Sequence, residues 1–132
     1  MSSRSILVLS NMDVEAIMSR VPAPELLETI ESVLCSLSES PETILSTPAR
    51  TTIVSSQHTT LFMPSRAESL STTAIKVVAV PTGDGKGGLP STSLVMDETT
   101  GVVDAVVNAR SLTALRTAAG RGAAICTRFP AN

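Results

Sequence analysis

Aromatic side chains are nearly absent from this sequence, which has no tryptophan, no tyrosine and two phenylalanines among its 132 residues. Proteins that bind single-stranded nucleic acid stack the bases on aromatic rings, and proteins that bind duplexes present a basic face. The formal net charge of −2 and the isoelectric point of about 5.3 give no basic face. We therefore expect no nucleic-acid partner, and a core built from aliphatic side chains and methionine.

Histidine and cysteine are equally scarce. His58 is the only histidine in the sequence, which excludes a catalytic triad or a metal cluster built on histidine, so we expect no metal site. Within the polar stretch 55–58, His58 is expected to be a solvated loop residue. Cys35 and Cys126 lack CxxC spacing, which indicates reduced thiols in an intracellular protein. Cys35 lies among apolar neighbours on a predicted helix, where we expect a small buried side chain.

Long hydrophobic runs are missing as well. Near the start of the sequence, the longest wholly apolar run is Ile6–Leu9. It is too short for the core of a signal peptide and far too short to span a bilayer. The sequence thus predicts a cytoplasmic protein without a membrane partner, in which Ile6–Leu9 forms a short buried strand.

The composition that remains is that of one globular domain, with 42% hydrophobic and 17% charged residues. Ser10 and Asp13 have the spacing of a capping box, which predicts a helix to about Met18. Leucine, isoleucine and valine at helical spacing predict a second helix from Pro24 to Pro41. Alternating or apolar runs predict strands at 50–54, 59–63, 75–80, 93–96 and 102–107. A last helix is expected at 111–119, with Gly120 and Gly122 weakening its continuation. The pattern indicates an α+β fold: a single domain with a largely antiparallel sheet and flanking helices.

One glycine-rich stretch matches the residues of a nucleotide-binding motif, but the segment that follows it does not match. Residues 83–88 satisfy GxGxxG after a predicted strand. In a dinucleotide site these glycines open a helix, whereas Leu89-Pro90 and a β-rich run follow here. We interpret the stretch as a loop, which could still move over a ligand, and keep a stand-alone nucleotide cradle as the weaker alternative.

Three cations lie in apolar or small-residue surroundings. Arg50 starts a predicted strand, Lys76 lies inside the apolar run 75–80, and Arg116 lies on the last helix. Each could be a salt-bridged or snorkelling side chain. If the three converge, they form an anion site, because arginine forks suit carboxylate or phosphate.

Several segments occur in an order that resembles a known family. The most specific are Leu61-Phe62-Met63-Pro64 and the run Leu112–Ala119, which reads LTALRTAA. The steps Pro48-Ala49-Arg50, Lys76-Val77-Val78 and Gly88-Leu89-Pro90 accompany them. Together they resemble the N-terminal part of the ornithine cyclodeaminase/mu-crystallin family over nearly the whole chain.

The resemblance implies a function and a set of site residues. The family comprises NAD(P)-dependent oxidoreductases and relatives that act on amino acids and cyclic imines, and its first domain supplies substrate contacts and the dimer interface. By motif, Arg50 would bind the carboxylate of an amino or imino acid, and Lys76 and Arg116 would also contact the substrate. Ser91 and Arg116 would lie near the cofactor. No catalytic residue can be assigned, because the family's catalytic aspartate lies in a later segment. The resemblance also implies a homodimer.

The sequence departs from the family after this first domain. We expect residues 1–132 to be the N-terminal substrate-binding and dimerisation domain, truncated before the Rossmann domain that holds NAD(P). The stretch 120–132 looks less regular than an interdomain helix. The isolated chain is then expected to bind no NAD(P) stably and to be inactive. The alternative is a non-enzymatic, truncated remnant that acts as a dimerising or partner-binding module.

Overall fold

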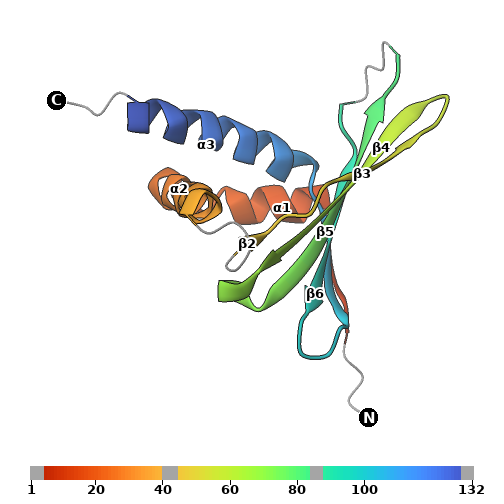
Figure 1. The fold of residues 1–132 in the computed structure, drawn as a ribbon, viewed down its shortest axis with the longest axis horizontal. Helices are drawn as coiled ribbons and strands as arrows, with labels where there is room; N and C mark the ends of the chain where they lie inside the picture. Colours follow the sequence, from red (N-terminus) through yellow and green to blue (C-terminus); the bar gives the residue numbers. More distant parts are fainter. Residues whose placement is uncertain (1–4, 40–44, 84–87, 129–132) are drawn as a thin grey trace.

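The computed structural model describes residues 5–39, 45–83 and 88–128 and shows three helices beside one sheet (Figure 1). The order along the chain is β1 (Leu7–Leu9), α1 (Asn11–Met18), α2 (Ala23–Glu39), β2 (Leu45–Ser46), β3 (Thr51–Val54), β4 (His58–Ala67), the 3-10 turn η1 (Glu68–Leu70), β5 (Thr72–Pro81), β6 (Ser91–Asp97), β7 (Val103–Asn108) and α3 (Arg110–Arg128). In the described residues no helix is long and apolar enough to cross a membrane.

The sheet confirms the predicted α+β class. Its seven strands have the order β1-β7-β6-β5-β4-β2, and β3 pairs with β4 beside β2. Every pairing is antiparallel except that of β1 with β7. The strands β4 and β5 pair over ten residues each, and so extend well beyond the predicted ranges.

Local signals fix several of the element boundaries. The Ser10 hydroxyl accepts from the Asp13 N–H at 3.3 Å, and the Ser10 N–H donates to Asp13 Oδ2 at 2.8 Å, which completes the predicted capping box of α1. The turn between β6 and β7 closes with the Gly101 N–H donating to the Asp97 carbonyl at 2.8 Å, and Gly101 has a φ of +68°. The strands β6 and β7 thus form one hairpin, and β3 and β4, which pair antiparallel on either side of residues 55–57, form another.

Pro64 lies inside a paired strand without breaking it. Its neighbour on β5 is Ile75. On its other side, β4 pairs with β3 only as far as Phe62 and with β2 only from Arg66 onward. Because a proline has no N–H to donate, the gap between these two pairings is a position where the strand tolerates it.

All three helices lie on one side of the sheet (Figure 1). Side chains alternate between the faces of a strand, and directly opposite residues share a face. We call the side that bears Lys76, Val78 and Ser91 the helix face, since Ser91 contacts Thr113 of α3. The opposite side is the open face.

One row of the open face is apolar across five strands, whereas Arg66 and Thr73 lie on the same face beyond its end. Register pairs Pro64 with Ile75, Ile75 with Leu94, Leu94 with Val106, and Val106 with Val8. Ile53 of β3 lies on the same face and is 56% exposed, and Val8 is 69% exposed. No helix of the described chain covers this row (Figure 1).

The chain buries little of its own apolar surface. The buried hydrophobic residues are Val14, Val78, Ala109 and Ala119, and no large side chain of the described residues is fully buried. The accessible surface is 9495 Å² for a 13.7 kDa chain. A folded monomer of this mass exposes about 6,600 Å².

Two predictions of burial, for the β1 strand and for Cys35, are wrong because few elements cover these residues. The β1 strand was expected to be buried, but Leu7 is 56% exposed and Val8 69%. Cys35 is exposed rather than buried, and the element that α2 mainly packs against is α3. The side chain of Cys126 lies outside the described part of the chain.

Two further predictions need correction. The final helix does not end near Ala119: α3 continues through Gly120 and Gly122 to Arg128. Each glycine costs about 1 kcal/mol relative to alanine, and packing of α3 against α2 and the buried Ala119 offset that cost. His58 is exposed, as expected, but it is the first residue of β4 rather than a loop residue.

Candidate functional site

Lys76 lies in the middle of the sheet on its helix face. It is the fifth residue of β5, opposite Met63 of β4 and Ser93 of β6. The side chain is half-buried, and burial lowers the pKa of its ammonium below the ordinary value of 10.5. The charge of Arg116 lowers this pKa further. Two cations from different elements therefore act on each other at this position.

Arg116 reaches this region because the start of α3 is attached to β6. The Ala109 N–H donates to the Ser91 carbonyl at 2.8 Å, which joins the residue before α3 to the first residue of β6. One turn later, the Thr113 hydroxyl lies 3.5 Å from Ser91 Oγ. Arg116 is three residues beyond Thr113, on the same side of the helix. Its guanidinium is exposed and forms no ion pair with a carboxylate of the described residues.

Ser91 is 5% exposed, so its hydroxyl is buried beneath α3. It lies opposite Val78, two residues along β5 from Lys76. The structure thus brings Lys76, Ser91 and Arg116 to one region of the helix face. The buried hydroxyl joins the sheet to the helix that bears the second cation.

Arg50 lies immediately before β3 and is exposed. The first pair of β3 and β4 joins Thr51 to Phe62. One more step of this register would place Arg50 opposite Met63, which is itself opposite Lys76. The backbones of Arg50 and Lys76 would then be two strand spacings apart, about 10 Å. A small carboxylate could be held between two long cationic side chains at that separation.

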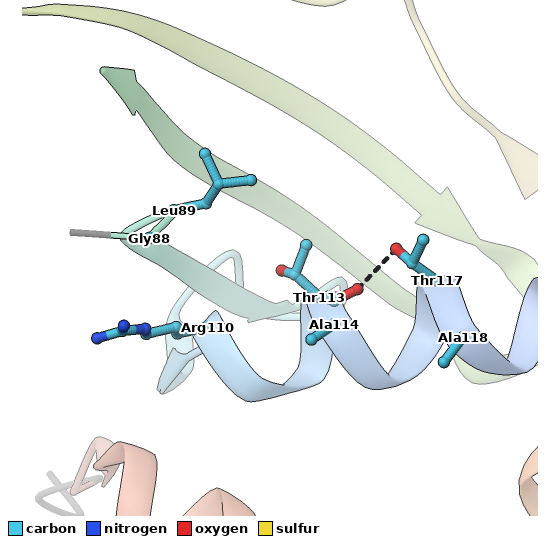
Figure 2. A pocket seen from close by; sticks show the side chains of 7 residues that line it. All are labelled: Gly88, Leu89, Arg110, Thr113, Ala114, Thr117 and Ala118. Carbon is cyan, nitrogen blue, oxygen red and sulfur yellow. Dashed lines mark hydrogen bonds between the residues drawn. The ribbon is translucent and has the colours of Figure 1, made fainter. Parts of the chain in front are cut away.

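A groove runs beside these residues, between the segment that enters β6 and one side of α3 (Figure 2). Its volume is about 500 Å³, and it is lined by Gly88, Leu89, Arg110, Thr113, Ala114, Thr117 and Ala118. The Thr113 and Thr117 hydroxyls donate to backbone carbonyls one turn back, at 2.6 and 2.7 Å. These bonds turn the polar atoms toward the helix, and the wall of the groove consists mainly of small apolar groups.

Two close contacts near the site were not predicted from the sequence. Thr113 is inside the LTALRTAA motif, but its contact with Ser91 depends on the packing of α3 on β6. Gly88 has a φ of +74°, and a Cβ there would lie 2.9 Å from Nη2 of Arg110. The presence of glycine at position 88 was the only sequence feature that could have indicated this close approach of Arg110 to the backbone. The residues 84–87, which complete the GxGxxG pattern, lie outside the described residues.

The pH dependence of the free energy of unfolding should reveal that the protonated form of Lys76 is unfavourable in the folded chain. Because its folded pKa is lowered, the folded chain holds this proton less tightly than the unfolded chain. The protonated lysine therefore costs stability at neutral pH, and stability rises as the pH climbs through the folded pKa toward 10.5. We expect Lys76→Met to raise the melting temperature at pH 7 by a few degrees, with the gain shrinking near pH 10.5. Thermal denaturation followed by circular dichroism measures this, with Arg20→Met as the exposed control; a gain that is equal at both pH values would contradict it.

The described chain is thus an α+β domain in which a helix packs on a sheet, with two cations near a buried hydroxyl on the helix face. The element that follows the glycine-rich stretch is the strand β6, as expected, and not a helix. The sequence model of the ornithine cyclodeaminase/mu-crystallin family matches residues 7–132. The chain therefore belongs to this family, which confirms the resemblance found in the sequence.

Solved structures support the assignment of the fold. Δ1-pyrroline-2-carboxylate reductase of Thermococcus litoralis, in complex with NADH and L-proline, is 30% identical with a TM-score of 0.74, over 89% of this chain and 36% of the other. An archaeal alanine dehydrogenase dimer with bound NAD is 22% identical with a TM-score of 0.71, over 89% and 35%. A lysine cyclodeaminase that recognises L-lysine, L-ornithine and L-2,4-diaminobutyric acid is 26% identical with a TM-score of 0.68, over 86% and 36%.

The chain thus spans about a third of the length of these structures. A comparison with curated protein sequences gives no match.

Proposed function

We propose that residues 1–132 form the substrate-binding and dimerisation domain of an NAD(P)-dependent oxidoreductase that acts on amino or cyclic imino acids. The observation that carries the proposal is the pairing of Lys76 with Arg116 on the helix face, where each cation lacks a carboxylate partner among the described residues. Such a pair is costly unless an anion joins it. Membership in the family and the likeness to a reductase solved with L-proline support an amino-acid carboxylate as that anion.

The roles follow from the placement of each side chain. Lys76 and Arg116 hold the carboxylate, and Arg50 closes the site from β3 through a bidentate contact. Ser91 of β6 and Arg116 of α3 lie beside the groove. This groove receives the nicotinamide end of a cofactor that is held mainly by a separate domain. When bound, the cofactor supplies hydride transfer. The task of the present residues is to orient the substrate.

The open face supports dimerisation. An apolar row that crosses five strands exceeds the scattered exposure normal for a monomer. We propose that a second copy covers the open face. The free thiol of Cys35 suits the reducing cytoplasm, where we place the protein.

Ligand binding by the 132-residue chain tests the substrate role. We expect L-proline to shift the amide signals of Lys76, Ser93 and Arg116 in ¹⁵N NMR titrations, and L-prolinamide, which lacks the carboxylate, to shift none. Without a dinucleotide-binding domain the 132 residues should not oxidise or reduce either compound with NAD(P). Equal binding of proline and prolinamide would contradict the carboxylate site. Dimerisation without any carboxylate binding would instead favour the non-enzymatic, partner-binding alternative.

A further inference from the structure

A second groove lies between α1 and α3. Both helices start at the sheet and lead away from it side by side (Figure 1). The volume of the groove is about 570 Å³, which is within the size range of small-molecule sites. Lys76, Ser91 and Arg116 do not line it, so this groove is separate from the candidate site on the helix face.

The wall of this α1–α3 groove is mainly aliphatic. Met18 of α1 and Leu115 of α3 are half-buried, and Ala114 and Ala118 of α3 are exposed. The lining begins at Ser111 and reaches Ala118 two turns later, so it extends about 10 Å along the helix axis. Because methionine adapts its shape to irregular partners, such a wall accepts an unbranched aliphatic chain.

Glu15 is the one charged side chain among the described residues that line the groove. Its Oε1 atom lies 2.7 Å from the Ser111 hydroxyl and accepts from Asn11 Nδ2 at 2.7 Å. The Ser111 hydroxyl is also 2.7 Å from Asn11 Oδ1. Three side chains from α1 and the start of α3 therefore hold the carboxylate in place at one end of the groove.

The second carboxylate oxygen remains open to a ligand. Within residues 5–39, 45–83 and 88–128, Glu15 Oε2 has no hydrogen-bond or ion-pair partner. The hydrogen bonds from Ser111 and Asn11 lower the pKa of Glu15, so the carboxylate is ionised at neutral pH. A carboxylate held through one oxygen can accept a charge-assisted hydrogen bond through the other with little loss of side-chain freedom.

The end of α1 adds negative potential to the same groove. The helix ends at Met18 and is capped by Ser19, and both residues line the groove. The C-terminal end of a helix dipole favours a cation, yet the last turn of α1 has no basic residue. Arg110, which also acts on Glu15, lines the other groove of α3. The described lining of the α1–α3 groove thus combines an aliphatic wall with negative potential and contains no cation.

We propose that the α1–α3 groove binds a small organic ammonium compound with an unbranched aliphatic chain. The ammonium group donates to Glu15 Oε2, and the chain lies along Met18 and Leu115 toward Ala118. An organic anion is repelled by Glu15, and a neutral molecule gains only the aliphatic contact. This inference goes beyond the proposed function and does not depend on it.

Three compounds with the same chain and different head groups test the proposal. n-Hexylammonium, 1-hexanol and hexanoate carry a positive, a neutral and a negative head group. In ¹⁵N NMR titrations of the 132-residue chain at pH 7 and low salt, we expect n-hexylammonium to shift the amide signals of Glu15, Ser19, Leu115 and Ala118. We expect 1-hexanol to bind at least ~10-fold more weakly and hexanoate to cause no shifts. The advantage of the ammonium compound should shrink as salt is added.

Two substitutions separate the charge from the wall. Glu15→Gln keeps the shape of the side chain and an oxygen that accepts from Asn11, but removes the charge, so we expect n-hexylammonium to bind ~10-fold more weakly, like 1-hexanol. Ala118→Leu fills the groove without changing its charge and should weaken both compounds. Glu28→Gln is the matched control, because Glu28 is an exposed carboxylate of α2 that does not line the groove.

The outcomes that would overturn the proposal are distinct from those for the proposed function. Affinities of n-hexylammonium and 1-hexanol within about twofold of each other would contradict the role of the charge, as would unchanged binding by Glu15→Gln. Absence of n-hexylammonium binding would overturn the site as a whole. Binding of L-proline is detected at Lys76, Ser93 and Arg116, so the carboxylate site is tested independently.

Discussion

Replacing Arg116 by alanine is expected to weaken the binding of L-proline to this chain by about 100-fold. A hydrogen bond between charged partners contributes roughly 1.5–3 kcal/mol, and a 100-fold change in affinity corresponds to about 2.8 kcal/mol. Arg116→Lys keeps the charge but loses the fork, so it should lie between the wild type and Arg116→Ala. Dissociation constants from NMR titration or calorimetry measure the effect, because the chain has no tryptophan or tyrosine for fluorescence.

Lys76 provides an internal check on this prediction. If Lys76 and Arg116 bind one carboxylate together, the losses caused by Lys76→Ala and Arg116→Ala will not add in the double variant. Additive losses would indicate two independent anion contacts. Arg20→Ala is the matched control, because Arg20 is an exposed cation just beyond α1. Binding of L-proline by Arg116→Ala within about twofold of the wild type would contradict the proposed role of Arg116.

If a second copy covers the open face as proposed, a charge placed on this face is expected to convert the dimer into a monomer. Ile53 is 56% exposed on this face, and in a two-fold symmetric dimer each substitution enters the interface twice. Ile53→Lys would place two ammonium groups in an apolar contact, and an unpaired buried charge costs several kcal/mol. We expect the dissociation constant of the dimer to rise by at least ~100-fold, as measured by sedimentation equilibrium at micromolar concentrations.

The neighbouring residue provides the control. Val54 is 72% exposed but points to the opposite side of β3, because side chains alternate along a strand. Val54→Lys should therefore remain a dimer. A second pair, Val8→Lys on the open face against Leu7→Lys on the helix face, repeats the comparison on β1. Loss of the dimer in the Val54 and Ile53 variants alike would show that the open face is not the specific interface.

The approximate positions of most helices and strands could be predicted from the sequence because their signals are local. The capping box needs only Ser10 and Asp13, and the β6–β7 turn needs only the residues from Asp97 to Gly101. The LTALRTAA motif indicated both the last helix and the family. An isolated lysine in an apolar strand was enough to identify Lys76 as a candidate site residue, since such a charge requires a reason to be there.

Burial and register were decided only by tertiary structure, because they depend on residues far apart in the chain. The exposure of Cys35 and of β1 reflects which elements lack a covering neighbour, and the apolar pattern of a segment does not contain that information. Helix α3 continues beyond Gly120 because it packs against α2, although the low helix propensity of glycine predicts that the helix ends there. The site shows the same division: the chain sequence supplied Lys76 and Arg116, whereas the pairing of β5 with β6 and the attachment of α3 to Ser91 brought their charges together.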